Sequence, residues 1–182
     1  TNEDCKYYTD KYQFMPKDGY TKMFEKILNH KNIEVILNTD YKNILETVNF
    51  DKMIYTGPID YFFDYKFGKL PYRSIRFEFR NFEKNLLQES AVYNYTGNEM
   101  EFTRVTEYKH LTSQKSESTT ISYEYPTSCG DPYYPIPTFK NQSKFRLYKK
   151  EIDKLNNVFI CGRLGEYRYY EMGQVIMSAL NK

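Results

Sequence analysis

The stretch from Val158 to Met172, VFICGRLGEYRYYEM, contains residues whose types and spacing could bind a ligand. An apolar run stops at Gly162, which is typical of a strand that ends in a glycine turn, and from Met172 apolar residues recur at the spacing of a buried helical stripe. Such a junction presents backbone amides and the positive end of a helix dipole. It therefore favours an anionic or electron-rich ligand group, with a purely structural turn as the alternative.

Tyrosine could supply further ligand contacts, because the 182 residues include 20 tyrosines and 13 phenylalanines but no tryptophan. A tyrosine combines a flat apolar ring with a hydroxyl group that donates or accepts hydrogen bonds, which suits the binding of a sugar or a nucleotide. A tyrosine-rich sheet with half-buried rings is the alternative, and we expect it to apply to most of these residues. The proline-rich stretch Gly130 to Pro137 displays Tyr133 and Tyr134 side by side on an extended loop, which could also be merely a rigid surface loop.

Arg104 shares one face of a predicted strand with Phe102 and Tyr108, because successive side chains of a strand alternate between its faces. An arginine between rings can bind a phosphate through two hydrogen bonds, but it can equally be a surface residue or part of a salt bridge. Glu124 lies between two tyrosines and could likewise be a functional or a surface residue, with solvent exposure as the simpler interpretation. The sequence has no nucleophile-base pair, metal-ligand spacing or Walker loop, so its side chains alone offer no obvious reaction.

Two kinds of element must position these residues. A helical stripe from Tyr20 to Leu28 and short strands at Ile33 to Leu37, Lys52 to Tyr55 and Val158 to Cys161 predict part of a parallel α/β layer. Between them, runs without intervening helices predict four antiparallel strands, at Tyr72 to Phe79, Ala91 to Thr96, Phe102 to His110 and Ser118 to Tyr125. A polar helix from Ser143 to Leu155 leads back to the closing strand, so the antiparallel sheet is inserted into the layer.

Composition excludes several classes of protein. The 26 basic and 24 acidic side chains leave a net charge of only +2, which gives no reason to expect a nucleic-acid partner. The three cysteines, Cys5, Cys129 and Cys161, are too few and too scattered for a disulfide scaffold or a paired zinc motif, so we expect reduced thiols. No apolar run is long enough to cross a membrane and the first residues lack the features of a signal peptide, so we expect a cytoplasmic protein without membrane insertion.

Six sequence motifs, taken in order, resemble those of the bacterial-type UDP-galactopyranose mutases. They are YTGPID at Tyr55–Asp60, FDYKFG at Phe63–Gly68, LPYRS at Leu70–Ser74, TRVTEYKH at Thr103–His110, GDPYYP at Gly130–Pro135 and GRLGEYRYY at Gly162–Tyr170. The resemblance runs over essentially the whole chain but covers only about the C-terminal half of that enzyme. The Gly-x-Gly-x-x-Gly turn that would hold the FAD pyrophosphate does not occur in this sequence, nor do the acidic ribose-binding residue and most of the helical domain.

The resemblance implies a mixed α/β fold in which a partial parallel FAD-domain layer carries an inserted antiparallel substrate-binding sheet. Residues 1–18 would connect to the helical domain, 19–60 and 156–182 would form the partial FAD-binding layer, and 61–155 would form the substrate-binding sheet. The implied activity is an isomerase reaction that interconverts UDP-galactopyranose and UDP-galactofuranose, the precursor of galactofuranose in cell-envelope polysaccharides. Reduced FAD acts in this family as the nucleophile, through an adduct between its N5 atom and the sugar, which is consistent with the lack of a protein nucleophile.

The resemblance also assigns roles to individual residues. The catalytic set is Arg104, Tyr134 and Tyr169, which would contact the pyrophosphate. Further substrate-binding residues are Tyr7, Tyr8, Arg73, Asn94, Glu124 and Glu171, and the cofactor-binding residues are Thr56, Gly57, Pro58, Gly162, Arg163, Leu164, Tyr170 and Met172. No metal ligand is implied. Two positions depart from the family pattern, because Glu171 replaces the usual Asp and Ser128-Cys129 stands where a segment with a tryptophan is expected.

Two hypotheses for the chain as it stands come from different classes of protein. In the first, it is the C-terminal portion of a flavin-dependent mutase that is inactive alone and binds FAD weakly or not at all. In the second, it is a non-catalytic module whose tyrosine-rich sheet binds a nucleotide sugar or a protein. If half of the parallel sheet is missing, the strands near Ile33 to Leu37, Met53 to Tyr55 and Val158 to Ile160 would have exposed edges, so we expect self-association or a rearranged sheet.

Overall fold

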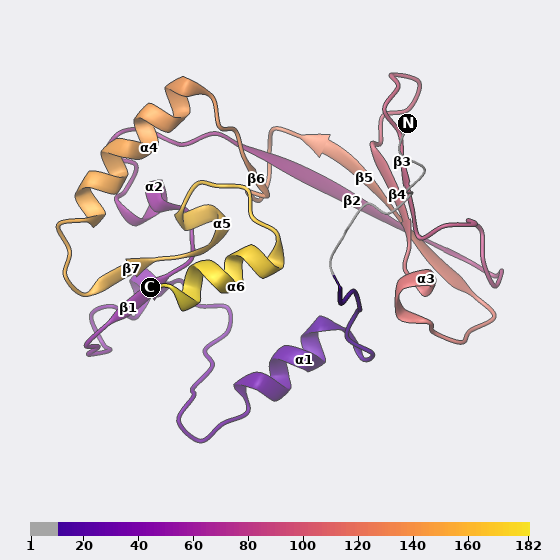
Figure 1. The fold of residues 1–182 in the computed structure, drawn as a ribbon, viewed down its shortest axis with the longest axis horizontal. Coiled ribbons are helices and arrows are strands. Elements are labelled where there is room, and N and C mark those ends of the chain that lie inside the picture. The colour runs from indigo at the N-terminus through magenta and orange to yellow at the C-terminus, as the bar shows by residue number, and fades with distance from the viewer. Residues whose placement is uncertain (1–10) are drawn as a thin grey trace. The chain divides into compact units, whose positions relative to one another are not determined.

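A computed structural model describes residues 11–182, which divide into two compact units (Figure 1). Of the described residues, the first unit contains 11–38 together with Glu78–Tyr123, and the second contains Thr39–Phe77 together with Glu124–Lys182. Helices and strands occur together with a small parallel sheet and an antiparallel one, which confirms the mixed α/β fold. The domain boundaries expected at residues 18, 60 and 155 stay a prediction.

The second unit contains the parallel layer. Strands β1 (Met53–Tyr55) and β7 (Val158–Ile160) pair in parallel with Met53 opposite Val158, as the apolar runs predict. The helical elements of this unit are η1 (Tyr41–Asn43), α2 (Ile59–Phe62), α4 (Phe139–Ile152), α5 (Gly162–Gly165) and α6 (Met172–Leu180). Helix α4 contacts both α2 and β7, so it packs against the parallel layer.

The larger sheet has five strands in the order β3-β4-β5-β2-β6. Their bounds are β2 (Tyr72–Phe82), β3 (Val92–Asn94), β4 (Arg104–Glu107), β5 (Thr119–Thr127) and β6 (Tyr134–Pro135). The pairs β3-β4 and β2-β6 are antiparallel, and the long strands β2 and β5 run from one unit into the other. The first unit also contains α1 (Gly19–Leu28), which matches the predicted stripe, and the short helix α3 (Lys109–Thr112).

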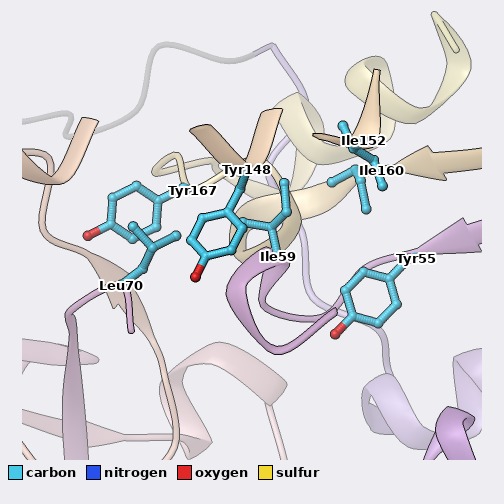
Figure 2. Close-up of a cluster of buried hydrophobic side chains, with 7 residues drawn as sticks. All are labelled: Tyr55, Ile59, Leu70, Tyr148, Ile152, Ile160 and Tyr167. Carbon is cyan, nitrogen blue, oxygen red and sulfur yellow. The ribbon is translucent and has the colours of Figure 1, made fainter. Parts of the chain in front are cut away.

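Tyrosines form much of the core of the second unit. Figure 2 shows its buried members, Tyr55, Ile59, Leu70, Tyr148, Ile152, Ile160 and Tyr167. The hydroxyl of Tyr148 donates to the carbonyl of Gly68 at 2.9 Å and accepts from the amide of Phe67 at 3.0 Å. The hydroxyl of Tyr167 donates to the carbonyl of Pro71 at 2.6 Å. These rings therefore fill the core while their hydroxyls satisfy the backbone of a tight turn, a structural role for part of the tyrosine excess.

Several sequence-based element predictions were wrong. The apolar run from Ile33 to Leu37 forms no strand, and Leu37 is 75% exposed, because no other described strand pairs with it. The apolar stripe of α6 is not buried, since Leu180 is also 75% exposed. The strand predicted from Phe102 to His110 is shorter: β4 covers Arg104–Glu107, and α3 begins at Lys109.

Helix α4 begins at Phe139, four residues before the predicted start at Ser143. Thr138 provides the start signal, because its hydroxyl accepts a hydrogen bond from the amide of Asn141 at 3.3 Å. The proline-rich loop also contains the short strand β6, which pairs with β2. No helix among residues 11–182 is both long and apolar enough to span a membrane.

Candidate functional site

Three residues singled out from the sequence meet in the second unit, and we call them the Arg-Tyr cluster: Arg163, Tyr134 and Tyr169. The guanidinium of Arg163 lies 4.6 Å from the ring centroid of Tyr169 and 5.3 Å from that of Tyr134. The two rings are themselves stacked, with centroids 5.8 Å apart and planes inclined by 16°. A guanidinium over aromatic faces keeps its charge and most of its donors available, so the cluster presents a fixed cation beside two phenols.

The backbone around the Arg-Tyr cluster holds it in place. Arg163 lies on α5 and donates to the carbonyl of Tyr133 at 3.3 Å and to that of Tyr170. Strand β6 places Tyr134 directly opposite Arg73 of β2, so a fourth predicted residue lies on the adjacent strand. Tyr169 is 57% exposed, and within the described residues no hydrogen bond occupies its hydroxyl or that of Tyr134. These phenols can therefore donate to an anionic ligand.

The two segments predicted to contact a flavin lie side by side in the same unit. The amide of Cys161 donates to the carbonyl of Tyr55 at 3.0 Å, which brings the turn after β7 next to the turn after β1. Gly162 has φ +82°, and a Cβ placed on it would lie 3.9 Å from the Cβ of Thr56. The turn at Gly162 therefore needs glycine for its backbone conformation, because L residues rarely adopt positive φ. Leu164 is more constrained than predicted, since its carbonyl accepts from the hydroxyl of Tyr72 at 3.3 Å.

These turns fit one edge of a flat cofactor but not its phosphates. The turns at Thr56 to Pro58 and at Gly162 offer adjacent backbone with little side-chain bulk, as the edge of a ring system requires. A dinucleotide also needs a glycine-rich loop for its pyrophosphate, and the 182 residues contain no Gly-x-Gly-x-x-Gly run. The described residues therefore suit the ring system of FAD and offer no glycine-rich loop for its pyrophosphate.

The start of α6 is already capped from within the chain. Glu171 is its N-cap residue and forms a capping box with Gln174, in which the amide of Glu171 donates to the side-chain oxygen of Gln174 at 2.9 Å. The carboxylate of Glu171 accepts from the backbone amide at the third helical position. The chain therefore supplies its own anion where the sequence analysis expected a ligand, and the predicted substrate contact of Glu171 stays a prediction. Met172, predicted to contact the cofactor, is exposed.

Arg104 and Asn94 come together in the first unit. They lie directly opposite each other on β4 and β3, and the Nε of Arg104 donates to the Oδ1 of Asn94 at 3.0 Å. Both residues are exposed. The asparagine side chain therefore helps to orient the guanidinium, a group whose geometry suits a phosphate or a carboxylate. Glu124, on β5, is half-buried, and Tyr7 and Tyr8 lie outside the described residues.

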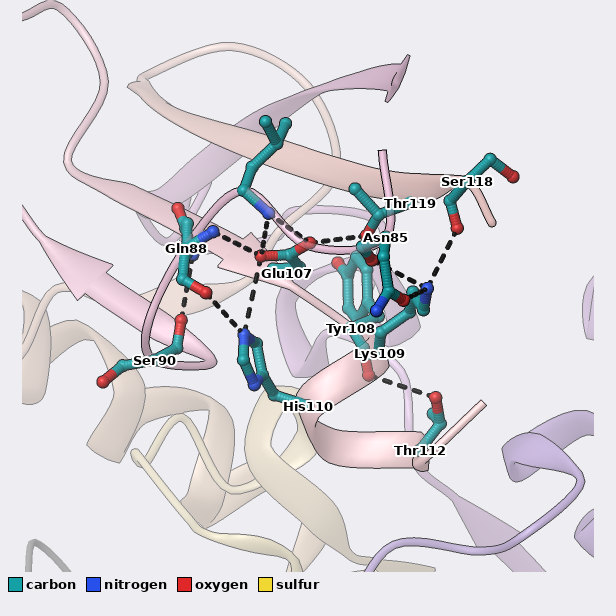
Figure 3. A network of polar contacts seen from close by, with 11 residues as sticks. Asn85, Gln88, Ser90, Glu107, Tyr108, Lys109, His110, Thr112, Ser118 and Thr119 are labelled. Carbon is teal, nitrogen blue, oxygen red and sulfur yellow. Dashed lines mark hydrogen bonds and ion pairs between the residues drawn. The ribbon is translucent and has the colours of Figure 1, made fainter. Parts of the chain in front are cut away.

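The sequence analysis missed a buried polar network beside Arg104, shown in Figure 3. Glu107 has no exposed surface and accepts from the hydroxyl of Thr119 at 2.6 Å and from the amides of Gln88 and Leu87 at 2.7 and 3.1 Å. The Nε2 of His110 lies 3.5 Å from its carboxylate. Burial acts to raise the pKa of Glu107, but the hydrogen bonds from Thr119, Gln88 and Leu87 outweigh it and hold the pKa below its usual range.

The ammonium of Lys109 completes this network from the start of α3. It donates to the carbonyl and to the side-chain oxygen of Asn85, both at 2.7 Å, and to the carbonyl of Ser118 at 3.3 Å. The network thus attaches the loop at residues 85–90 to β4 and β5 and supports the strand that carries Arg104. The available signal was the alternation that puts Val105, Glu107 and Lys109 on one face, but charged residues are usually exposed and the sequence shows no partners for them.

Comparison with known proteins links this arrangement to one family. A family model described as UDP-galactopyranose mutase matches residues 1–169. A probable UDP-galactopyranose mutase of Klebsiella pneumoniae is 36% identical over 98% of the chain and 47% of its own length. A dTDP-fucopyranose mutase of Escherichia coli is 33% identical over 98% of the chain and 50% of its own length. A UDP-galactopyranose mutase of Mycoplasma genitalium is 34% identical over 100% of the chain and 49% of its own length. The chain spans about half the length of the curated relatives it matches.

Proposed function

This chain belongs to the UDP-galactopyranose mutase family, and we propose that it is the C-terminal, substrate-binding portion of an isomerase that interconverts UDP-galactopyranose and UDP-galactofuranose. The Arg-Tyr cluster is the observation that supports this proposal most strongly. It holds a guanidinium within 5.3 Å of the centres of two stacked tyrosine rings, and an arginine together with phenol hydroxyls is a donor set that suits a diphosphate. Arg104, oriented by Asn94, supplies a second cation of the same kind in the first unit.

In this proposal the protein binds and orients while a cofactor supplies the reacting atom. Reduced FAD, when bound, would provide the nucleophile for the anomeric carbon. The Arg-Tyr cluster would hold the UDP group as it leaves and returns, because fixed donors stabilise the charge that develops on the departing diphosphate. Thr56 to Pro58 and Gly162 to Leu164 would contact the flavin ring, and the cytoplasmic location expected from the sequence belongs to the same proposal.

The isolated chain should not catalyse this reaction. It offers turns for one edge of the ring but no glycine-rich loop for the pyrophosphate of FAD. The test mixes the purified chain with FAD, dithionite and UDP-galactopyranose, and follows flavin fluorescence and furanose formation by chromatography. We expect no furanose and no tight flavin binding. Turnover by this polypeptide alone would overturn the assignment of the chain as an incomplete enzyme.

A second sugar nucleotide is a candidate substrate, because one of the similar relatives is a dTDP-fucopyranose mutase. Both substrates carry the nucleoside diphosphate that the Arg-Tyr cluster suits, so the cluster alone does not choose between them. Glu171, where the resemblance leads us to expect an aspartate, caps α6, so its carboxylate is engaged at the start of that helix. Calorimetric titration of the chain with UDP-galactose and with dTDP-fucose separates the two, and we expect tighter binding of UDP-galactose.

A non-catalytic binding module remains the competing hypothesis. It would keep affinity for a sugar nucleotide or a protein without any need for a flavin. The two hypotheses differ once the rest of the family sequence is supplied, because only the mutase should then form furanose in the presence of reduced FAD.

A further inference from the structure

Strand β6 is too short to hold its own place beside β2. It contains only Tyr134 and Pro135, and a proline has no amide hydrogen to donate to the ladder. Just after the strand, the amide of Ile136 lies 3.4 Å from the carbonyl of Pro71, which is long for a hydrogen bond. The position of Tyr134 therefore needs support from outside the two strands.

The hydroxyl of Tyr167 bridges this weak end of the pairing. It donates to the carbonyl of Pro71 at 2.6 Å, accepts from the amide of Ile136 at 3.2 Å and lies 3.1 Å from the carbonyl oxygen of Ile136. Tyr167 is 1% exposed, and Figure 2 shows its ring among the buried side chains of the core. Hydrogen bonds shielded from water in this way are stronger than those at a surface. A buried hydroxyl thus closes the ladder where the short strand ends.

Tyr167 also belongs to the segment that carries the rest of the Arg-Tyr cluster, because Arg163 precedes it and Tyr169 follows it. The amide of Tyr167 donates to the carbonyl of Leu164 at 3.3 Å. Its ring meets that of Tyr72 edge-on, with centroids 5.2 Å apart, and the hydroxyl of Tyr72 donates to the same carbonyl of Leu164 at 3.3 Å. The start of β2 is therefore tied to this segment at two points, through Tyr72 and through Tyr167.

The backbone at Tyr167 has a conformation that residues other than glycine rarely adopt. Its φ is +45°, in the left-handed region. This conformation is unfavourable for an L residue and persists only where the surroundings fix it. Tyr167 is buried, whereas Tyr169 is 57% exposed. The strained residue thus lies where the chain passes from the core to the exposed part of the cluster, and strain of this kind is common beside functional groups.

We propose that Tyr167 is the positioning residue of the Arg-Tyr cluster: its buried hydroxyl holds β6, which carries Tyr134, against the segment that carries Arg163 and Tyr169. Tyr167 is too buried to contact a ligand and acts through these three residues. Without its hydroxyl, the end of β6 can move away from β2, and the guanidinium and the two phenols lose their fixed spacing. The diphosphate as ligand rests on the proposed function, whereas the link itself rests on the hydrogen bonds.

Tyr167→Phe tests the proposal in the full 182-residue chain, since it removes the hydroxyl and keeps the ring. Tyr148→Phe is the matched control, because Tyr148 belongs to the same core and its hydroxyl also bonds to two backbone groups, those of Phe67 and Gly68. Both variants should lose similar stability in urea unfolding. In calorimetry, Tyr167→Phe should weaken UDP binding by about tenfold, because the cluster must then be ordered on binding, while Tyr148→Phe should leave the affinity unchanged.

The side-chain resonances of Arg163 report on the cluster whether or not UDP binds. Protons held against aromatic rings are shifted by the ring currents, and the guanidinium lies close to the rings of Tyr134 and Tyr169. In isotope-labelled protein, the Nε–H signal of Arg163, assigned with Arg163→Lys, should move toward that of a free arginine in Tyr167→Phe and stay in place in Tyr148→Phe. Tyr72→Phe removes the other link and should move the signal in the same direction by less.

The proposal is overturned if Tyr167→Phe leaves the Arg163 signal in place, if it leaves UDP affinity unchanged in a chain that binds UDP, or if Tyr148→Phe has equal effects. Should Tyr167→Phe not fold, an Arg163 signal that Tyr72→Phe leaves in place also overturns it. Absence of UDP binding by the wild type would instead overturn the proposed function, and the Arg163 signal alone would then decide whether Tyr167 positions the cluster.

Discussion

At the scale of single residues, the chain separates binding groups from supporting groups. Tyr134, Tyr169 and Arg163 are partly or largely exposed and hold one another by ring and cation contacts. Glu107 and Lys109 are buried, and their charged groups are surrounded by hydrogen-bond partners. The hydroxyls of Tyr134 and Tyr169 can therefore be removed at little cost in stability, whereas buried charges cannot lose a partner cheaply.

Tyr169→Phe should weaken UDP binding without destabilising the fold. The variant removes only the hydroxyl, and a hydrogen bond to a charged phosphate contributes about 1.5–3 kcal/mol, so the dissociation constant should rise by about 10- to 100-fold. Isothermal titration calorimetry measures the affinity, and thermal unfolding should give an unchanged midpoint because the ring remains. Tyr12→Phe, at a tyrosine that is 73% exposed in the other unit, is the control. Equal affinity of both variants for UDP would argue against a phosphate contact at Tyr169.

Glu107→Gln should reduce stability at neutral pH and change its pH dependence. The new side-chain NH2 group would replace an oxygen that accepts from the backbone amides of Gln88 and Leu87, so the free energy of unfolding should fall by about 1–3 kcal/mol. Because the folded pKa of Glu107 lies below its usual value of 4.5, the carboxylate stabilises the fold above that value, and this contribution is lost as the pH falls through the lowered pKa. Urea unfolding between neutral and acid pH should therefore show an acid loss of stability in the wild type that is smaller in the variant.

The exposed Glu117 provides the comparison for this measurement. Glu117→Gln should leave both the neutral stability and its pH dependence unchanged. If Glu107→Gln gave a curve parallel to that of the wild type, the carboxylate would not be the source of the acid dependence.

At the scale of elements, turns at strand ends decide where the functional residues lie. The turn at Gly162 connects β7 to α5, which carries Arg163, and the loop that follows carries Tyr169 and the cap of α6. Strand β6 is short, but its pairing with β2 fixes Tyr134 opposite Arg73. The site thus depends on a glycine and on a two-residue strand more than on any long helix.

Gly162→Ala should destabilise the second unit through its backbone alone. A Cβ at this position meets no close atom, but φ is +82°, and a left-handed conformation costs an L residue about 1–2 kcal/mol. Gly173, inside α6, has no atom within 4 Å and no positive φ. Gly173→Ala should therefore stabilise the helix by about 0.5–1 kcal/mol. Chemical denaturation of the two variants measures these opposite effects, and a stabilising Gly162→Ala would show that the turn does not need glycine.

Local periodicity was enough to predict α1, β1, β7 and the long strands of the antiparallel sheet. It failed where distant residues decide the outcome. Residues 33–37 have the composition of a strand, but none of the described strands pairs with them, and α3 ends a predicted strand where Lys109 bonds to Asn85 and Ser118. The stripe of α6 marks an amphipathic helix correctly, but a stripe does not reveal whether another element covers it.

For the candidate site, the motifs identified the residues, and the structure added their partners. The pairing of Arg104 with Asn94 and the contacts of Arg163 with two tyrosine rings depend on strand register and on a loop, which spacing alone does not encode. The Glu107 network was not predicted because its partners come from a separate loop.

At the scale of the whole molecule, the described residues combine a five-stranded sheet with a parallel pair of strands. The chain spans about half the length of the relatives it matches. Binding of a sugar nucleotide by the residues present can therefore be measured on this chain, separately from the reaction proposed for the longer protein.

Calorimetric titration of the 182-residue chain with UDP is the most direct test of its assignment as a sugar-nucleotide-binding portion of a mutase. The wild type should bind UDP, and Arg104→Ala should weaken binding by about tenfold or more, since a charged hydrogen bond to phosphate contributes about 1.5–3 kcal/mol. Arg146→Ala, at an exposed arginine of α4, should bind as the wild type does. Absence of UDP binding by the wild type, or equal affinity of Arg104→Ala, would contradict the account.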